Sequence, residues 1–444
     1  MTATSDPRAP DAPDRDAAAL DLATVDRLVV VSAQPPDEVL GAGGLIRRVH
    51  DRGTPVEIVV ASNGERTHPD SPTHPPERLW ALHRDETARA VRTLAPGAGL
   101  RRLGLPHGAL ADHVPDLVAA VRDAVGAAGD RALIVTTWRD DGGPDHRAVA
   151  RAAQTAGAAT GAAVAEFPVR GWSWLRRDDP RVHPSRLAVL RLTDAEVLAK
   201  RRAVREHRSQ IGPLGPAPQD RAALGPDAIE RGDRAHELFL PVRRSLTAGY
   251  FTELYRAADD PWRLGGSWYE ERKRALTAAA LPRARFRSAF EPGCAVGLLT
   301  ELLAPRCDRY LAADIAAEPL ARVTQRLAGQ DHVDVRRLTL PDQWPDGDFD
   351  LVVLSEVGYY LDHVDLSRVI ERTVSALTPD GVVLACHWRH PAAGYPLTGD
   401  EVHAALAAEP GLITLAAHTE EDFRLDVFAR PGTPSVARAD GVLA

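Results

Sequence analysis

The chain has 444 residues, of which 44% are hydrophobic and 26% are charged, as is usual for a soluble globular protein. Its formal net charge of −8 argues against a nucleic-acid partner, which would need a basic surface. No apolar run approaches the ~20 residues of a membrane span, and the polar N-terminus lacks the features of a signal peptide, so we expect a cytoplasmic protein with no membrane partner.

In chain order, residues 1–24 lack an apolar pattern, and we expect them to be disordered. Short apolar runs then alternate with helical segments. Strands are predicted at 28–31, 55–61 and 132–137, and helices at 40–50, 76–94, 145–158 and 195–210. A second series of strands is predicted at 288–291, 309–314, 350–355 and 381–387.

This alternation predicts an α/β fold with two doubly wound, mostly parallel Rossmann-like sheets in tandem. We expect a first domain at 25–245, a linker at 246–266, a second domain at 267–431 and a loose tail at 432–444. The oligomeric state stays open, a homo-oligomer included.

The second domain carries a glycine-containing turn between a strand and a helix. The segment reads Glu291-Pro-Gly293-Cys-Ala295-Val-Gly297, and Asp314 ends the next strand. Glycine permits a tight turn that approaches a ligand, and an acid at a strand end can bind ribose hydroxyls. Alternatively, the glycines close an ordinary turn and Asp314 caps a helix.

These motifs resemble those of class I S-adenosylmethionine-dependent methyltransferases, and most of all NodS-like N-methyltransferases. The resemblance implies that Glu291, Gly293, Ala295 and Gly297 hold the methionine end of the cofactor. The other cofactor-binding residues that it implies are Trp268, Tyr269, Asp314, Ile315, Thr339, Leu340 and Ser355. Ala295 replaces a glycine of the family, and Thr339 stands where an acid is often found.

The cofactor that this resemblance implies carries an activated methyl group, so the protein mainly has to align an unprotonated nucleophile. His387, His390 or Glu356 could accept the proton of an amine, and these are the candidate catalytic residues. The alternative for His387 is a hydrogen-bonding role at a strand end.

The first domain resembles the PIG-L/LmbE de-N-acetylases. The resemblance places Gln34, Asp37 and His146 at the zinc-ligand positions, Pro36 at the general base and Gly143 at a transition-state histidine. Zinc prefers imidazole, thiolate or carboxylate ligands, so the remnant site is expected to be weak or empty. Two alternatives remain open: weak metal binding persists, or another base such as Asp145 or Glu38 has been recruited.

The leading hypothesis is a methyltransferase for a small amine- or hydroxyl-bearing molecule, with a de-N-acetylase-like domain that is inactive with zinc. An amino sugar or a secondary metabolite is favoured as acceptor, because a deacetylase would expose the amine that a NodS-like domain methylates. The rival hypotheses are a bifunctional de-N-acetylase and N-methyltransferase with a non-standard metal site, and a non-enzymatic binding or scaffold protein.

Overall fold

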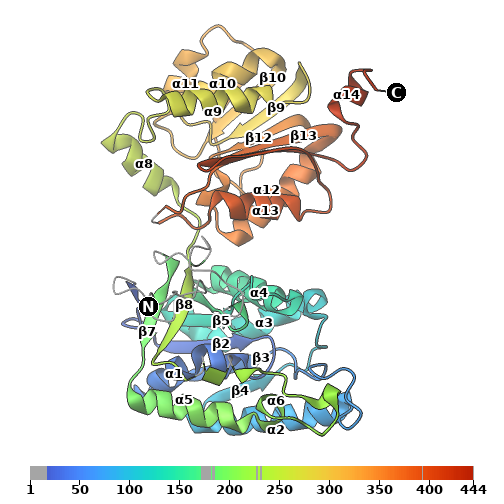
Figure 1. Cartoon of the computed structure of the whole chain (residues 1–444). Coiled ribbons are helices and arrows are strands. Elements are labelled where there is room, and N and C mark those ends of the chain that lie inside the picture. Colours follow the sequence, from blue (N-terminus) through green and yellow to red (C-terminus); the bar gives the residue numbers. More distant parts are fainter. Residues whose placement is uncertain are drawn as a thin grey trace, which may run out of the picture. The chain divides into compact units, whose positions relative to one another are not determined.

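The computed structural model describes residues 18–171, 182, 186–226, 229–230, 233–392 and 394–443. The chain divides into two compact units, Met1–Val242 and Arg243–Ala444, which we call unit 1 and unit 2 (Figure 1). Each unit has a hydrophobic core on both faces of its own sheet. Within the described residues, no helix is both long enough and apolar enough to cross a membrane.

Unit 1 contains a sheet of eight strands in the order β1-β7-β8-β6-β5-β2-β3-β4. Strand β2 pairs in parallel with β3 and β5, whereas β8 runs antiparallel to β6 and β7. The strand order reverses between β2 and β5, where open α/β sheets bind their ligands. The strands are β1 (Ala18–Ala19), β2 (Arg27–Ser32), β3 (Val56–Val60), β4 (Gly99–Arg102), β5 (Ala132–Thr137), β6 (Ala163–Phe167), β7 (Ala188–Arg191) and β8 (His236–Val242).

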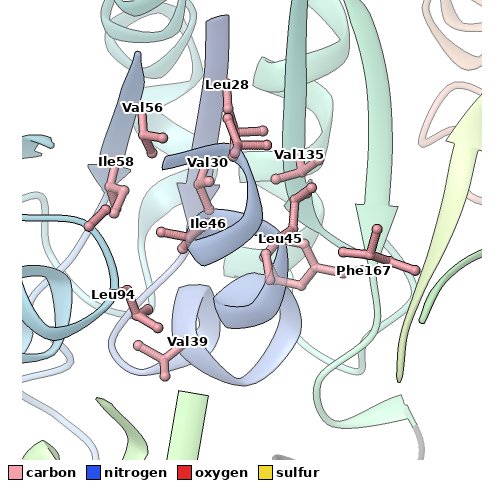
Figure 2. Close-up of a cluster of buried hydrophobic side chains, with 14 of the residues drawn as sticks. Leu28, Val30, Val39, Leu45, Ile46, Val56, Ile58, Leu94, Val135 and Phe167 are labelled. Carbon is pink, nitrogen blue, oxygen red and sulfur yellow. The ribbon is translucent and has the colours of Figure 1, made fainter. Parts of the chain in front are cut away.

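The helices of unit 1 cover both faces of this sheet. They are α1 (Asp37–Asp51), α2 (Pro76–Leu94), α3 (Val114–Val125), α4 (Pro144–Thr160), α5 (Asp194–Glu206) and α6 (Arg208–Ile211). In Figure 2, Leu45 of α1 lies in a cluster with Leu28 and Val30 of β2. Val29 and Val31 belong to the opposite core with α3 and α4. Because successive strand residues face opposite sides, a strand covered on both faces must be apolar throughout.

Unit 2 contains a sheet of seven strands in the order β11-β10-β9-β12-β13-β15-β14. The first five strands are parallel, and β15 is antiparallel to β13 and β14. The strands are β9 (Phe286–Pro292), β10 (Cys307–Asp314), β11 (Val333–Arg337), β12 (Phe349–Ser355), β13 (Leu377–Trp388), β14 (Ile413–Thr419) and β15 (Phe423–Ala429). The strand order reverses between β9 and β12, which places a second ligand-binding position there.

Helices also cover both faces of the second sheet (Figure 1). Residues of α9 (Trp268–Ala279), α10 (Leu298–Leu303) and α11 (Leu320–Arg326) share one core cluster. Residues of α8 (Ala248–Ala257), α12 (His363–Ala376) and α13 (Gly399–Ala407) share the other. The predicted fold class, two doubly wound and mostly parallel α/β sheets, is therefore confirmed.

Three segments predicted to be irregular contain regular structure. Residues 1–17 lie outside the described part of the chain, but Ala18–Ala19 forms β1 and pairs with β7. The predicted linker at 246–266 contains α8, whose Phe251 and Tyr255 are buried in the core of unit 2. The predicted tail at 432–444 contains the short helix α14 (Val436–Ala439).

Candidate active site

A cavity of about 520 Å³ lies in unit 2 at the carboxyl ends of β9, β10 and β12. This is the switch point of the sheet, and the volume lies within the roughly 300–1,000 Å³ of small-molecule sites. The cavity is lined by seven residues assigned to the site from the sequence: Tyr269, Gly293, Ala295, Asp314, Ile315, Leu340 and Glu356.

The turn after β9 forms the floor of this cavity. Gly293 and Gly297 have φ angles of +74° and +78°, in the left-handed region that glycine tolerates. Ala295 has a φ of +47° and so adopts a conformation that costs an L-residue about 1–3 kcal/mol. Hydrogen bonds hold the turn: the Cys294 N–H donates to the Ala313 carbonyl at 2.9 Å, and the Ala295 N–H donates to Asp314 Oδ2 at 3.1 Å. Ala295 therefore holds a left-handed conformation within a hydrogen-bonded turn.

Asp314 ends β10 beside this turn and lines the cavity. Its Oδ1 accepts the Ala316 N–H at 2.9 Å, and its Oδ2 accepts the Ala295 N–H. Burial raises the pKa of Asp314 to about 6, against the effect of these hydrogen bonds. The carboxylate thus braces the turn and also faces the space where a ligand would lie.

Glu291 and Gly297 do not line the cavity, and their contact with the cofactor stays a prediction. Glu291 Oε2 accepts hydrogen bonds from Thr300 Oγ1 at 2.6 Å and from the Tyr310 hydroxyl at 2.9 Å. The Glu291 side chain is fully buried, and burial raises its pKa to about 7. Glu291 therefore supports the turn from behind.

Three further predicted cofactor residues also lie off the cavity lining: Trp268, Thr339 and Ser355. Trp268 is 71% exposed, so the structure does not show the covering position expected for it. The Thr339 N–H donates to Gln343 Oε1 at 2.8 Å, and the Thr339 carbonyl accepts the Gln343 N–H, so this backbone forms a local turn.

Glu356 follows β12 and is held by several donors. Lys273 Nζ of α9 lies 2.7 Å from Glu356 Oε1 and 2.8 Å from Glu270 Oε1. The Tyr359 hydroxyl and the Trp388 N–H both donate to Glu356 Oε2. The backbone of Glu356 has a φ of +54°, a strained conformation of the kind found at functional sites. The structure thus places this carboxylate firmly at the cavity.

His387 does not line the cavity, and its catalytic role stays a prediction. The side chain is fully buried, and its Nε2 accepts the Gly358 N–H at 3.1 Å. His387 Nδ1 lies 3.2 Å from His403 Nε2, and His403 Nδ1 lies 2.8 Å from Asp426 Oδ2. Burial, and then His403 and Lys273, lower the pKa of His387 well below its usual value. We call these four linked groups the imidazole relay.

His390 also lies away from the cavity lining. Its side chain is exposed, and its Nε2 lies 2.8 Å from Asp422 Oδ1. Of the three predicted catalytic residues, the structure therefore brings Glu356 to the cavity.

Several cavity residues received no role from the sequence. They are Lys273, Trp388 and the aromatic side chains Phe251, Tyr255, Trp262, Tyr359, Tyr360 and Tyr395. The spacing of Glu270 and Lys273 indicates a helical ion pair, and Tyr359 and Tyr360 follow Glu356 closely. Trp388 directly follows the candidate His387 in the sequence, whereas Tyr395 offered no signal, because tertiary structure brings it to the cavity.

The remnant metal site of unit 1 lies at the carboxyl end of β2, at the switch point of that sheet. Asp37 and His146 are buried against each other, with 3.3 Å between Asp37 Oδ2 and His146 Nε2. Burial lowers the pKa of His146, but the Asp37 carboxylate outweighs it and the net shift is upward. A Cβ on Gly143 would lie 3.1 Å from His146 Nδ1, so a histidine there would press on this ring.

The donor set at this position does not fit a zinc ion. In the described part of the chain, no three His, Cys, Asp or Glu side chains come together in a set able to hold a metal ion. Asp145 accepts the N–H groups of Gly108 and Leu110, which engages the carboxylate that we considered as a recruited base. The other candidate, Glu38, is fully buried, and burial raises its pKa to about 8.

Two families of known proteins match the chain, one in each unit. Residues 251–393 match the family model of nodulation protein S (NodS), and residues 29–157 match that of GlcNAc-PI de-N-acetylase (PIG-L). Nodulation protein S of Bradyrhizobium diazoefficiens is 36% identical over 135 residues, which are 29% of this chain and 62% of that protein. The chain thus spans about three fifths of the length of this relative.

Two crystal structures are also similar to the chain. The N-methyltransferase NodS from Bradyrhizobium japonicum WM9, in complex with S-adenosyl-L-homocysteine, is 26% identical; the match covers 42% of this chain and 100% of that one, with a TM-score of 0.39. A Pseudomonas syringae protein named as a methyltransferase is 49% identical; the match covers 37% and 100%, with a TM-score of 0.34. From the two family matches, the chain carries a PIG-L domain at residues 29–157, followed by a NodS-type S-adenosylmethionine-dependent methyltransferase domain at residues 251–393.

Proposed function

We propose that unit 2 transfers the methyl group of S-adenosylmethionine to a small amine- or hydroxyl-bearing molecule, with an amine favoured. One observation carries this proposal: a single cavity joins the turn and Asp314 to the carboxylate of Glu356. The first part suits a nucleoside cofactor, and the second suits an amine acceptor.

The proposal gives each part of the cavity a task. Gly293 and Ala295 let the backbone approach the methionine end of the cofactor, Asp314 accepts hydrogen bonds from the ribose, and Ile315 and Leu340 contact the adenine. The cofactor supplies a methyl group on a sulfonium, so no further activation of the donor is needed. Glu356, fixed by Lys273, orients the acceptor amine by charge at the mouth of this cradle.

Calorimetry with S-adenosylhomocysteine tests the cofactor site. Asp314→Ala should weaken binding by about 1–3 kcal/mol, because it removes charge-assisted hydrogen bonds to the ribose. Asp308→Ala is the matched control, since Asp308 lies on the same strand but is exposed and pairs with Arg285.

Because Asp314 also braces the turn, thermal unfolding of Asp314→Ala shows whether its loss of binding reflects a loss of fold. Equal binding by Asp314→Ala and wild type would overturn the site assignment. If the wild-type protein shows no saturable binding of S-adenosylhomocysteine, the hypothesis of a non-enzymatic scaffold replaces that of a methyltransferase.

We also propose that unit 1 does not catalyse zinc-dependent deacetylation. The proposal is supported by Gln34, Pro36 and Gly143 at positions where that chemistry needs a ligand, a base and a transition-state group. The lack of a third ligand supports it further, because within the described residues Asp37 and His146 do not form part of a set of three side chains able to hold a metal ion. The pairing of a PIG-L domain with a methyltransferase still favours an amino sugar, or a related secondary metabolite, as the molecule both units recognise.

A further inference from the structure

Three charged side chains meet in the lining of the cavity; we call Glu270, Lys273 and Glu356 the charge triad. Lys273 Nζ lies 2.8 Å from Glu270 Oε1 and 2.7 Å from Glu356 Oε1. Burial lowers the pKa of Lys273, but Glu356 and Glu270 outweigh it and the net shift is upward. The lysine therefore keeps its charge, and two carboxylates against one ammonium leave the charge triad with one net negative charge.

The charge triad lies beside the turn that forms the floor of the cavity. Strands β9 and β12 are parallel neighbours in the sheet, and the turn follows β9 as Glu356 follows β12. A Cβ on Gly293 would lie 3.2 Å from the side chain of Val357, the residue after Glu356. Glu356 therefore belongs to a segment that packs directly against the turn.

Under the proposed function, the turn receives the methionine end of the cofactor and Asp314 receives the ribose. The sulfonium of S-adenosylmethionine joins these two parts, so its positive charge would lie beside the charge triad. S-adenosylhomocysteine, the product, has a neutral thioether at the same position. The two molecules differ by one methyl group and one positive charge, and a net negative charge nearby attracts only the sulfonium.

The other charged side chains of the lining do not cancel this attraction. They are Arg263 and Asp314. Arg263 is exposed, so water and salt screen its charge, whereas the side chains of Lys273 and Glu356 are only 6% and 22% exposed. Asp314 is an acid and adds no positive charge. The buried charges of the lining are therefore negative in sum.

From this arrangement we propose that the charge triad, through Glu356, selects the sulfonium of S-adenosylmethionine over the thioether of S-adenosylhomocysteine. The inference rests on the proposed function and gives Glu356 a specificity-determining role towards the cofactor. In the reaction, the lone pair of the acceptor forms a bond to the methyl carbon, and the C–S bond breaks with its electron pair left on sulfur. The sulfur becomes neutral and loses its attraction to the charge triad, which favours release of the product.

Calorimetry of the full-length chain with each of the two molecules, without an acceptor, tests this selection. The quantity measured is the Kd for S-adenosylhomocysteine divided by the Kd for S-adenosylmethionine. Glu356→Gln removes the charge, and its amide oxygen can still accept the Trp388 N–H. We expect the ratio to fall at least about tenfold, because one nearby charge is lost from a partly buried site.

Glu420→Gln is the matched control, because Glu420 pairs with Arg272 of the same helix but does not line the cavity. Its ratio should stay within about twofold of the wild-type value. Glu270→Gln is a second variant for the case that Glu356→Gln does not fold. It removes the same charge from the charge triad and leaves the hydrogen bonds from Tyr359 and Trp388 to Glu356 in place, so the ratio should again fall.

An unchanged ratio in Glu356→Gln, or equal weakening of both ligands, would overturn the proposal; Glu270→Gln decides in the same way if the first variant is unfolded. Thermal unfolding of each variant shows whether it is folded. If the wild-type protein binds neither molecule, the proposed function itself fails, whereas binding of both with a ratio that ignores the charge defeats this inference alone.

Discussion

Glu291, which supports the turn from behind, makes the stability of unit 2 depend on pH. Its carboxyl group is fully buried beside Thr300 and Tyr310, and burial raises its pKa from the ordinary value of 4.5 to about 7. The folded state therefore binds a proton more tightly than the unfolded chain does. The stabilisation from this proton is complete below pH 4.5 and is lost as the pH rises to about 7.

We predict that Glu291→Gln removes this pH dependence. The amide oxygen can still accept from Thr300 and Tyr310, and no charge has to be buried. Relative to wild type, the variant should gain up to about 3 kcal/mol between pH 5 and pH 8, at about 1.4 kcal/mol for each pKa unit. Urea unfolding at the two pH values measures the difference.

Glu301→Gln is the control, because Glu301 lies on the adjoining helix but is half-exposed and pairs with Arg326. It should show little change at either pH. A difference between Glu291→Gln and wild type that stays constant with pH would show that Glu291 is ionised throughout.

Among single residues, those whose position depends on the local backbone could be predicted from the sequence. The turn and Asp314 are specified by glycine positions and by a strand end, so the motif places them at the cavity. The burial of His387 could not be predicted, because a sequence does not reveal that a histidine is linked to distant residues such as His403 and Asp426. Lys273 was missed for the same reason, since its partner Glu356 is far away in the chain.

The imidazole relay connects separate elements of unit 2. His387 lies on β13, His403 on α13 and Asp426 on β15, and together they fix the N–H of Gly358. A Cβ on Gly358 would lie 3.0 Å from His387 Nε2 and 2.5 Å from a methyl of Val402, so only glycine fits without movement. The relay therefore positions the turn that carries Tyr359 and Tyr360.

We predict that His387→Ala destabilises the protein and does not alter the pH dependence of catalysis. The change leaves the Gly358 N–H and His403 without their partner, which should cost about 1–3 kcal/mol in the free energy of unfolding. Because its pKa is lowered well below 6.5, His387 is neutral throughout the working range, so the pH profile of kcat/KM should keep its shape. Chemical unfolding and a pH–rate series measure the two effects.

His390→Ala is the matched control, since this exposed histidine pairs with Asp422 outside the relay. It should alter neither the unfolding free energy nor the profile. If the fall in kcat/KM at low pH disappears in His387→Ala, His387 is the proton acceptor.

Among the elements, the central parallel strands β2, β3, β5, β9, β10, β12 and β13 could be predicted because burial on both faces makes them apolar runs. The parallel strands β4, β6 and β11 were not predicted. Strand β14 was missed because it lies at the sheet edge and most of its residues are exposed, so its sequence carries no such run. Helix α8 was missed because Ala257-Ala-Asp-Asp-Pro261 indicates a break in the chain. In the structure this break follows a helix that packs into the core through Phe251 and Tyr255.

At the scale of the whole molecule, both sheets place a candidate site at the point where the strand order reverses. The site in unit 2 is a cavity, whereas the site in unit 1 has an incomplete set of metal ligands. Both sheets reverse their strand order beside a central strand, β2 in unit 1 and β9 in unit 2, and both place their candidate residues at that point. The tandem organisation could be predicted because each half repeats the alternation of strands and helices. The sequence could not show that Asp37 and His146 contact each other, because that depends on how β2 and α4 are packed.

This contact leads to a prediction about the metal content of the full chain. Wild-type protein purified with zinc should hold well below one zinc ion per chain, because Asp37 and His146 are two ligands where a catalytic site needs three. Gln34→His supplies an imidazole at the third position and should raise the zinc content towards one, and His146→Ala in that background should remove it again. The affinity of unit 2 for S-adenosylhomocysteine should be the same in all these variants, since every residue lining its cavity lies between Leu246 and Tyr395. Metal analysis with a parallel assay of acetate release from N-acetylglucosamine decides the matter. Near-stoichiometric zinc in wild type, lost in His146→Ala and accompanied by acetate release, would establish the bifunctional enzyme instead.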